Sequence, residues 1–249
     1  LNRGVRRALG FLSLIGLIIL ASSAYQLGES FRAESYYSNE QKIDLKASSY
    51  QLEIVQDDIY YSFYEGVNSD IWTVKEGKSY YKGIKLNIKK SSKDYTYLET
   101  EFRSRGYNRE DARKNSQNLN YIFEIDSNTL IFSNYYSINE GSFYRLQKIE
   151  HCLYMQTGDT IYLSPGTENL IYDIKNLNNY WDYNMDGHLW TMTEQGLLCV
   201  DCENSDEVWE NSIEEIETNI EENVESSNKV RIENDLIIIE EAEANLFSS

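Results

Sequence analysis

Residues 152–164 read Cys-Leu-Tyr-Met-Gln-Thr-Gly-Asp-Thr-Ile-Tyr-Leu-Ser, and this stretch decides the fold that the sequence predicts. Both of its ends are rich in aromatic and aliphatic residues, and its middle, 157–159, holds a glycine and an aspartate. Two such runs joined by a Gly/Asp turn are typical of neighbouring β-strands. A third short run, 171–174, follows after a loop. The stretch therefore predicts a unit of strand, turn, strand, loop and strand.

The same unit recurs upstream and downstream, and the second, third and fourth copies begin 31 and 29 residues apart. The predicted strands of the four copies are 52–55, 59–62 and 71–74; 121–125, 130–133 and 143–146; 152–155, 161–164 and 171–174; and 181–185, 189–192 and 198–200. Residues 80–88 and 95–98 predict further strands, and residues 230–239 predict a weaker fifth copy. Repetition at a fixed period is the signature of stacked or radially arranged β-sheets.

The copies resemble the blades of β-propeller-like domains of exported or membrane-anchored bacterial proteins. The runs that carry the resemblance are 58–62, 129–133 and 160–164, with 71–74 and 171–174 as companion strands. The resemblance covers residues 50–203 and implies a mainly β fold, propeller-like or of other repeat-built antiparallel sheets. A propeller blade spans about 40–45 residues, so the shorter spacing leaves both architectures open. No functional residue follows from the resemblance, because propellers host many functions.

The N-terminus predicts a membrane-inserting helix. Arg3, Arg6 and Arg7 precede an uncharged stretch, residues 8–28, which as a helix would rise about 31 Å, roughly one hydrocarbon thickness. The arginines are expected to stay cytoplasmic, so the remainder of the chain is exported. A signal peptide cleaved after Ala24 is the alternative. The sequence favours retention, because residues 25–28 extend the uncharged span and place a tyrosine at the interface. The lipid bilayer is thus the first expected partner.

Four parts follow from this organisation. Residues 1–28 are the cytoplasmic basic start and membrane anchor, and residues 29–41 are a polar linker. Residues 42–203 are the β-rich repeat domain outside the cytoplasm, within which residues 109–118 predict a short helix capped by Asn108. Residues 204–249 are an acidic helix with a terminal strand pair.

The formal net charge of −18 is concentrated in the last fifth of the chain. Residues 201–249 hold 16 Asp and Glu against Lys229 and Arg231. So acidic a chain is unsuited to neutralising phosphates, which excludes nucleic acid as a partner. An apolar stripe at helical spacing on the acidic helix predicts packing onto its own domain or onto a further envelope protein. The stripe consists of Trp209, Ile213, Ile216, Ile220 and Val224.

Cys199 and Cys202 form the sharpest local motif, Cys-Val-Asp-Cys. Export permits a disulfide between them, provided that the chain turns there, because residues three apart on a strand lie too far apart. The surrounding acids oppose the lowered thiol pKa that a redox centre needs. A zinc site would join the two cysteines to His188 and to His151 or Cys152. Structural sulfur is the favoured interpretation.

Residues 182–187 match the first half of a calcium loop, with Asp182, Asn184 and Asp186 at alternate positions and Gly187 sixth. The twelfth position is Thr193 rather than a bidentate glutamate, so a hairpin turn is the favoured interpretation. We expect no cofactor.

No Gly-x-Ser-x-Gly elbow occurs in the sequence, and neither histidine has an obvious nucleophile partner beyond Cys152. The leading hypothesis is therefore a non-enzymatic envelope protein, anchored in the bacterial cell membrane by a single span, with a binding or scaffolding role. Two alternatives remain: a secreted adhesin or glycan-binding protein, and an exported thiol- or metal-dependent enzyme that uses Cys199 and Cys202.

Overall fold

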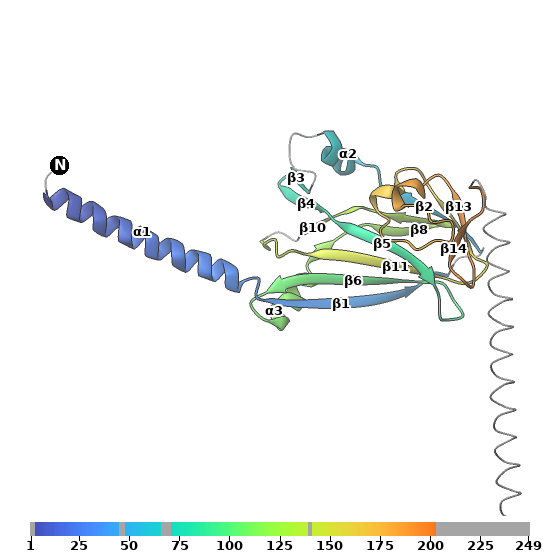
Figure 1. Cartoon of the computed structure of the whole chain (residues 1–249), viewed down its shortest axis with the longest axis horizontal. Helices are drawn as coiled ribbons and strands as arrows, with labels where there is room; N and C mark the ends of the chain where they lie inside the picture. Colours follow the sequence, from blue (N-terminus) through green and yellow to red (C-terminus); the bar gives the residue numbers. More distant parts are fainter. Residues whose placement is uncertain (1–2, 45–47, 66–70, 139–140, 203–249) are drawn as a thin grey trace, which may run out of the picture. The chain divides into compact units, whose positions relative to one another are not determined.

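A computed structural model describes residues 3–44, 48–65, 71–138 and 141–202 (Figure 1). The chain divides into two compact units, of which the first ends at Asp201. The predicted acidic helix, with its stripe from Trp209 to Val224, and the weak fifth copy lie outside the described residues. All that follows concerns the described residues.

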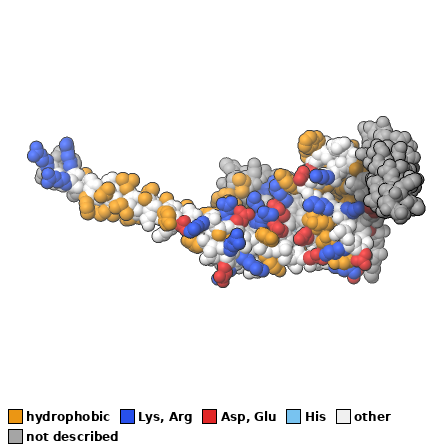
Figure 2. Space-filling model, turned by 60° about the horizontal axis from the view of Figure 1, so that its bottom comes forward, with side chains coloured by type: hydrophobic (Ala, Val, Ile, Leu, Met, Phe, Trp, Pro, Cys, Tyr) orange, Lys and Arg blue, Asp and Glu red, His pale blue; other side chains and the backbone are white. Residues whose placement is uncertain are grey.

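The first element is helix α1, Arg3–Glu29, which is longer at both ends than the predicted span. Its apolar window is not buried against any other part of the structure, and Leu20 is 70% exposed. Figure 2 shows hydrophobic side chains along this helix and Lys or Arg side chains near its start. Ser30 ends the helix by donating a hydrogen bond from Oγ to the Leu27 carbonyl, 2.7 Å away.

Fourteen strands form three sheets within the described residues. In spatial order, sheet A consists of β1 (Ala33–Lys42), β6 (Tyr97–Gly106), β11 (Lys148–Met155) and β5 (Ile84–Lys90). Sheet B consists of β14 (Leu197–Cys199), β13 (Leu189–Met192), β12 (Thr160–Leu163), β2 (Ser49–Ile54), β9 (Thr129–Phe132) and β8 (Phe123–Asp126). Sheet C consists of β3 (Trp72–Lys75), β4 (Lys78–Lys82), β10 (Tyr135–Ile138) and β7 (Leu119–Asn120). The helices besides α1 are α2 (Asp58–Glu65), α3 (Arg109–Ser116) and the short 3-10 turns η1 (Thr167–Asn169) and η2 (Asp182–Asn184).

The strand pairing confirms a mainly β fold and corrects the propeller. β5 pairs with β11 in parallel, and β2 pairs in parallel with both β12 and β9. A propeller blade is an antiparallel meander, whereas parallel neighbours need long crossover connections. The three sheets are not closed into a ring (Figure 1). Strand, turn and strand follow one another in the second copy, as β8 and β9, and in the third, as β11 and β12. However, β9, β11 and β12 also pair with distant strands instead of building separate blades.

The core lies between the inner faces of sheets A and B. On β11 every second residue is buried, as expected for a strand with one face inward. Leu52 of β2 lies in register with Leu130 and Leu163, and all three side chains are fully buried. The ring of Phe132 from sheet B lies 5.2 Å from that of His151 in sheet A, centroid to centroid. The two sheets thus pack face to face.

Several predicted strands are replaced by other structure. Residues 59–62 lie in α2, because the Asp57 carboxylate accepts hydrogen bonds from the backbone N–H groups of Ile59 and Tyr60 and caps the helix. Residues 143–146 and 181–185 form no strand, and residues 171–174 contribute only an isolated bridge at Ile171.

The predicted linker is also wrong in part. Ala33–Lys42 form β1, which pairs over its full length with β6 at the edge of sheet A. Its polar sequence suits an edge strand, since most of its side chains are exposed. The short helix over 109–116 is confirmed, and Asn108 caps it by accepting a hydrogen bond from the N–H of Asp111, 2.9 Å away.

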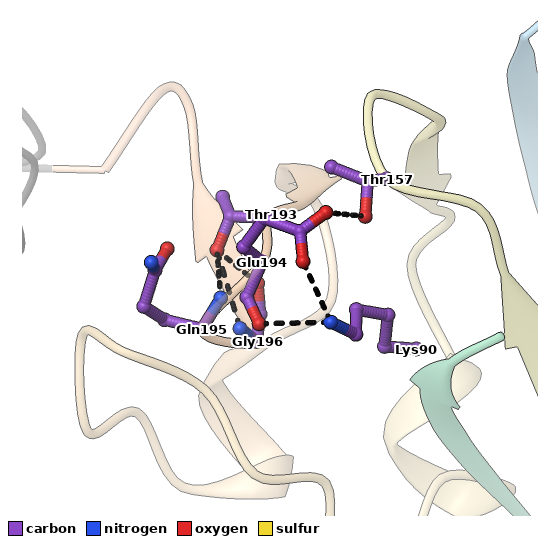
Figure 3. Close-up of polar contacts among 6 residues, drawn as sticks. All are labelled: Lys90, Thr157, Thr193, Glu194, Gln195 and Gly196. Carbon is purple, nitrogen blue, oxygen red and sulfur yellow. Dashed lines mark hydrogen bonds and ion pairs between the residues drawn. The ribbon is translucent and has the colours of Figure 1, made fainter. Parts of the chain in front are cut away.

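One polar cluster joins the end of sheet A to two turns of sheet B (Figure 3). Glu194 accepts hydrogen bonds from Lys90 Nζ and from Thr157 Oγ1, each at 2.8 Å. The hydrogen bond from Lys90 lowers the pKa of the Glu194 carboxyl. Thr193 closes the adjacent turn by donating to the Gly196 carbonyl at 2.7 Å and accepting from its N–H at 3.2 Å. These contacts fix the ends of β5, β11 and β13 relative to one another.

Candidate functional site

The segments that flank β13 and β14 bring together His188, Cys199, Asp201 and Cys202, whose candidate ligand atoms all lie within 4.8 Å of one another. Nδ1 of His188 is 3.2 Å from Oδ1 of Asp201. The same oxygen accepts a hydrogen bond from the Leu189 N–H at 3.0 Å, and Cys199 Sγ lies 3.5 Å from it. Asp201 therefore orients His188 and holds the start of β13.

The two cysteines of this cluster, Cys199 and Cys202, are disulfide-bonded, and Cys152 is the free cysteine. Disulfide sulfurs carry no thiolate, so the cluster offers zinc only His188 and Asp201 while the disulfide is intact. The sequence suggested His151 or Cys152 as the fourth ligand, but the cluster contains neither. It contains Asp201 instead, whose place inside the Cys-Val-Asp-Cys motif was the available signal.

His151 belongs to the core rather than to an active site. Its Nδ1 lies 2.9 Å from Thr100 Oγ1, and its ring packs between those of Tyr121 and Phe132. Burial lowers the pKa of His151 to about 3, so the imidazole is neutral. Cys152, its neighbour on β11, points to the other side of the sheet, and burial raises the pKa of its thiol. A protonated thiol is a weak nucleophile and a weak metal ligand.

The residues of the predicted calcium loop hold the backbone of their own chain. Asp182 accepts hydrogen bonds from the backbone N–H groups of Asp173 and Ile174, at 2.6 and 3.0 Å. Asp186 accepts one from Gly166 at 3.3 Å. Asn184 lies in η2 and donates its backbone N–H to the Trp181 carbonyl. Gly187 has a φ of +77°, as the predicted turn requires.

An open groove of about 640 Å³ lies along the loop from Tyr172 to Asp182. Tyr172 is 54% exposed and Trp181 is 70% exposed. Lys85 lies over the Tyr172 ring, with Nζ 3.2 Å from the centroid. Asn176 holds the loop that lines the groove in place. Its side-chain amide accepts a hydrogen bond from the Tyr180 N–H and donates one to the Tyr180 carbonyl, both at 2.8 Å. Two exposed aromatic rings on an ordered loop can stack on a ligand or pack against a protein.

A second hollow of about 340 Å³ continues this groove onto the outer face of sheet A and shares Tyr172 and Asp173 with it. It is lined by side chains of both charges, among them Lys89, Glu99 and Arg103. The sequence missed the groove, because residues 171–174 and 181–185 were predicted as strands. The signal in the sequence was the aromatic run of Tyr180, Trp181 and Tyr183.

No curated protein and no solved structure matches the chain. The family model of the ToastRack domain found in some PspC matches residues 73–205. That match begins inside β3, downstream of β1 and β2, although β2 lies in the middle of sheet B. Because the match covers more than half of the 249 residues, the chain belongs to the family of ToastRack domains found in some PspC.

Proposed function

We propose that this membrane-associated bacterial envelope protein is a non-enzymatic scaffold, held by α1 as a single transmembrane span with its β-domain outside the cytoplasm. The observation that carries the proposal is that the apolar surface of α1 is exposed and packs against no other described part of the chain. A helix of 27 residues rises about 40 Å, enough to cross a bilayer and its interfaces. Exposing such a surface to water is costly, whereas lipid covers it.

The flanking charges support the orientation. Arg3, Arg6 and Arg7 lie at the start of α1, whereas Glu29, Arg32 and Glu34 follow its end. Short cytoplasmic flanks carry the excess of Lys and Arg, so the N-terminal side is the cytoplasmic one. The β-domain then lies on the opposite side, where a disulfide such as Cys199–Cys202 persists.

The use of the polar groups supports a binding role rather than catalysis. The carboxylates of Asp182 and Asp186 hold backbone N–H groups, and His151 is buried in the core. By contrast, the groove beside Tyr172 and Trp181 is open and presents aromatic rings at its rim. We assign the partner contact of the β-domain to this groove.

Extraction of membranes tests the anchor. The full chain is expected to stay in membranes after an alkaline wash, and its intact mass is expected to include α1. Replacing Leu14 and Ile15 by lysine should release the protein, because each charge near the helix centre costs about 2.5–3.5 kcal/mol on insertion. Leu14→Ala with Ile15→Ala is the matched control and should remain in the membrane. Recovery of the unaltered chain in the wash, or a mature mass without α1, would refute the proposal.

A further inference from the structure

The arginines of the β-domain are confined to one of its ends. Between residues 29 and 200 the chain has 18 Lys and Arg, of which six are arginines. These six, together called the arginine end, are Arg32, Arg103, Arg105, Arg109, Arg113 and Arg145. The other 12 basic residues of this part are lysines.

Strand pairing places all six together. Ala33, which follows Arg32, pairs with Gly106, so the start of β1 lies beside the last residues of β6, which include Arg103 and Arg105. Helix α3, with Arg109 and Arg113, follows β6 at once and packs against both β1 and β6. The carbonyl of Arg145 accepts the N–H of Arg105 at 2.9 Å.

This end is also where α1 joins the domain. Three residues separate Glu29, the last of α1, from Ala33, the first of β1. Four extended steps span at most about 14 Å. An inserted α1 therefore holds the arginine end within reach of the lipid headgroups, whatever angle the helix makes with the domain.

The arginine end is basic although the domain as a whole is acidic. Residues 29–200 carry 18 Lys and Arg against 25 Asp and Glu, a net charge of −7. Residues 102–116 carry five basic and two acidic side chains, a net charge of +3. Residues 75–93 are also basic, with seven Lys against Glu76, a net charge of +6. The arginine end differs from that run in being tethered beside the headgroups by α1, so it is the basic surface that an anionic bilayer meets first.

The six arginines differ in their pairing. Arg32 pairs with Glu29 at 3.2 Å, Arg105 pairs with Glu34 at 3.3 Å, and Arg103 pairs with Glu101. Within the described residues, Arg109 and Arg113 form no ion pair. Both are exposed and stand one turn apart on α3, so their guanidinium groups share one face of the helix.

Exposed apolar side chains accompany the arginines. Phe143 is 74% exposed, Tyr107 is 53% exposed and Leu146 is 43% exposed. Arg145 lies over the rings of both Phe31 and Phe143, with its guanidinium carbon 5.1 and 5.4 Å from the centroids. Aromatic rings among basic residues are typical of the membrane–water interface.

We propose that the arginine end binds the phosphate groups of anionic lipids in the same membrane that holds α1, so that the β-domain rests on the bilayer. A guanidinium group can donate two parallel hydrogen bonds to the oxygens of one phosphate group, whereas the lysine ammonium acts as a point charge. Phe143 and Leu146 enter the headgroup region beside them. This inference rests on the proposed transmembrane α1, and it leaves the groove at Tyr172 and Trp181 free for a partner.

Hydrogen–deuterium exchange of the full chain in lipid nanodiscs tests this contact. Exchange of residues 107–116 and 141–147 should be slower in phosphatidylglycerol discs than in phosphatidylcholine discs, by about tenfold. The difference should shrink in high salt, because ions screen the attraction. A chain that does not stay in the discs at all would refute the anchor itself, whereas a chain that stays without any difference would refute only the lipid contact.

Matched variants separate this contact from a general charge effect. R109Q with R113Q should remove most of the protection, and R109K with R113K should restore part of it. K42Q with K93Q removes the same charge at the other end of sheet A, where Lys42 pairs with Tyr97, and should leave the protection unchanged. Equal loss in the lysine-to-glutamine control would overturn the proposal. Protection that appears in phosphatidylcholine discs on adding inorganic phosphate would overturn it too, because the site would then take free phosphate.

Discussion

The guanidinium carbon of Arg145 lies 5.1 Å from the centroid of the Phe31 ring. Phe31 belongs to the short segment between α1 and β1, whereas Arg145 lies in the loop that leads into β11. This contact joins the exit of the apolar helix to the central strands of sheet A. The anchor and the β-domain therefore meet at a structured junction, which supports one continuous unit from α1 to β14.

The domain is expected to need the strands upstream of the family match. Leu52 of β2 is fully buried between Leu130 and Leu163, so Leu52→Ala should lower the free energy of unfolding by about 2–5 kcal/mol. Its neighbour Glu53 faces outward, so Glu53→Ala should cost less than about 1 kcal/mol. Denaturant unfolding of the two variants measures both. A fragment of residues 73–205 that unfolds cooperatively by itself would contradict the central role of β2.

Stability is expected to depend on pH through His151. Burial lowers its pKa from 6.5 to about 3, so between these values the unfolded chain binds a proton that the folded chain does not. The free energy of unfolding should therefore fall as the pH drops below about 6.5, by up to about 1.4 kcal/mol per pH unit from this residue. His151→Gln removes this contribution. Unfolding midpoints between pH 4 and 8 should show a wild-type slope that exceeds the variant's, and equal slopes would exclude it.

Thiol titration is expected to count one free cysteine. Cys199 and Cys202 are disulfide-bonded and Cys152 is free, so the denatured, unreduced protein should react with one equivalent of a thiol reagent and the reduced protein with three. Cys199→Ser should lower the stability of the oxidised protein, by about 2 kcal/mol for so short a loop. Cys152→Ser serves as the control for loss of a thiol alone. Three reactive thiols before reduction would show that the motif holds no disulfide.

The loop that forms the groove is expected to depend on Asp182 and not on Trp181. Asp182→Ala leaves the N–H groups of Asp173 and Ile174 without their acceptor, so their amide hydrogens should exchange faster. Trp181→Ala should change the free energy of unfolding by less than about 0.5 kcal/mol, because the ring is 70% exposed. Hydrogen exchange and thermal unfolding measure the two effects. A large loss of stability in Trp181→Ala would show that the ring is structural.

Local pattern predicted many of the strands but not their partners, and residues 59–62, 143–146, 171–174 and 181–185 form no strand. The run 160–164 became β12, and the residues that follow the cap Asn108 became helix α3, because side-chain alternation and caps are local signals. The parallel pairing of β2 with β9 and β12 joins residues far apart in the sequence, and no local signal encodes such pairs. The polar strand β1 was missed because an edge strand needs no hydrophobic face.

For the candidate sites too, residue types could be predicted from the sequence, whereas burial and long-range contacts could not. His188, Cys199 and Cys202 were grouped from their residue types, and the structure brings them together with Asp201. His151 was a reasonable ligand by type, but its burial is a property of the whole core. The single strand predicted over 59–62 became α2, because the cap by Asp57 outweighed the β propensity of its tyrosines.

The central claim is that α1 crosses the membrane and leaves the β-domain outside the cytoplasm. It is tested most directly by an impermeant maleimide applied to intact cells that express reporters with one free thiol, in a Cys152→Ser background that keeps the disulfide-bonded Cys199 and Cys202. Asp94→Cys lies on the exposed surface of the β-domain, and Gly4→Cys lies at the start of α1. The account predicts that Asp94→Cys is labelled in intact cells and that Gly4→Cys is labelled only after permeabilisation. Labelling of Gly4→Cys in intact cells, with Asp94→Cys protected until lysis, would contradict it.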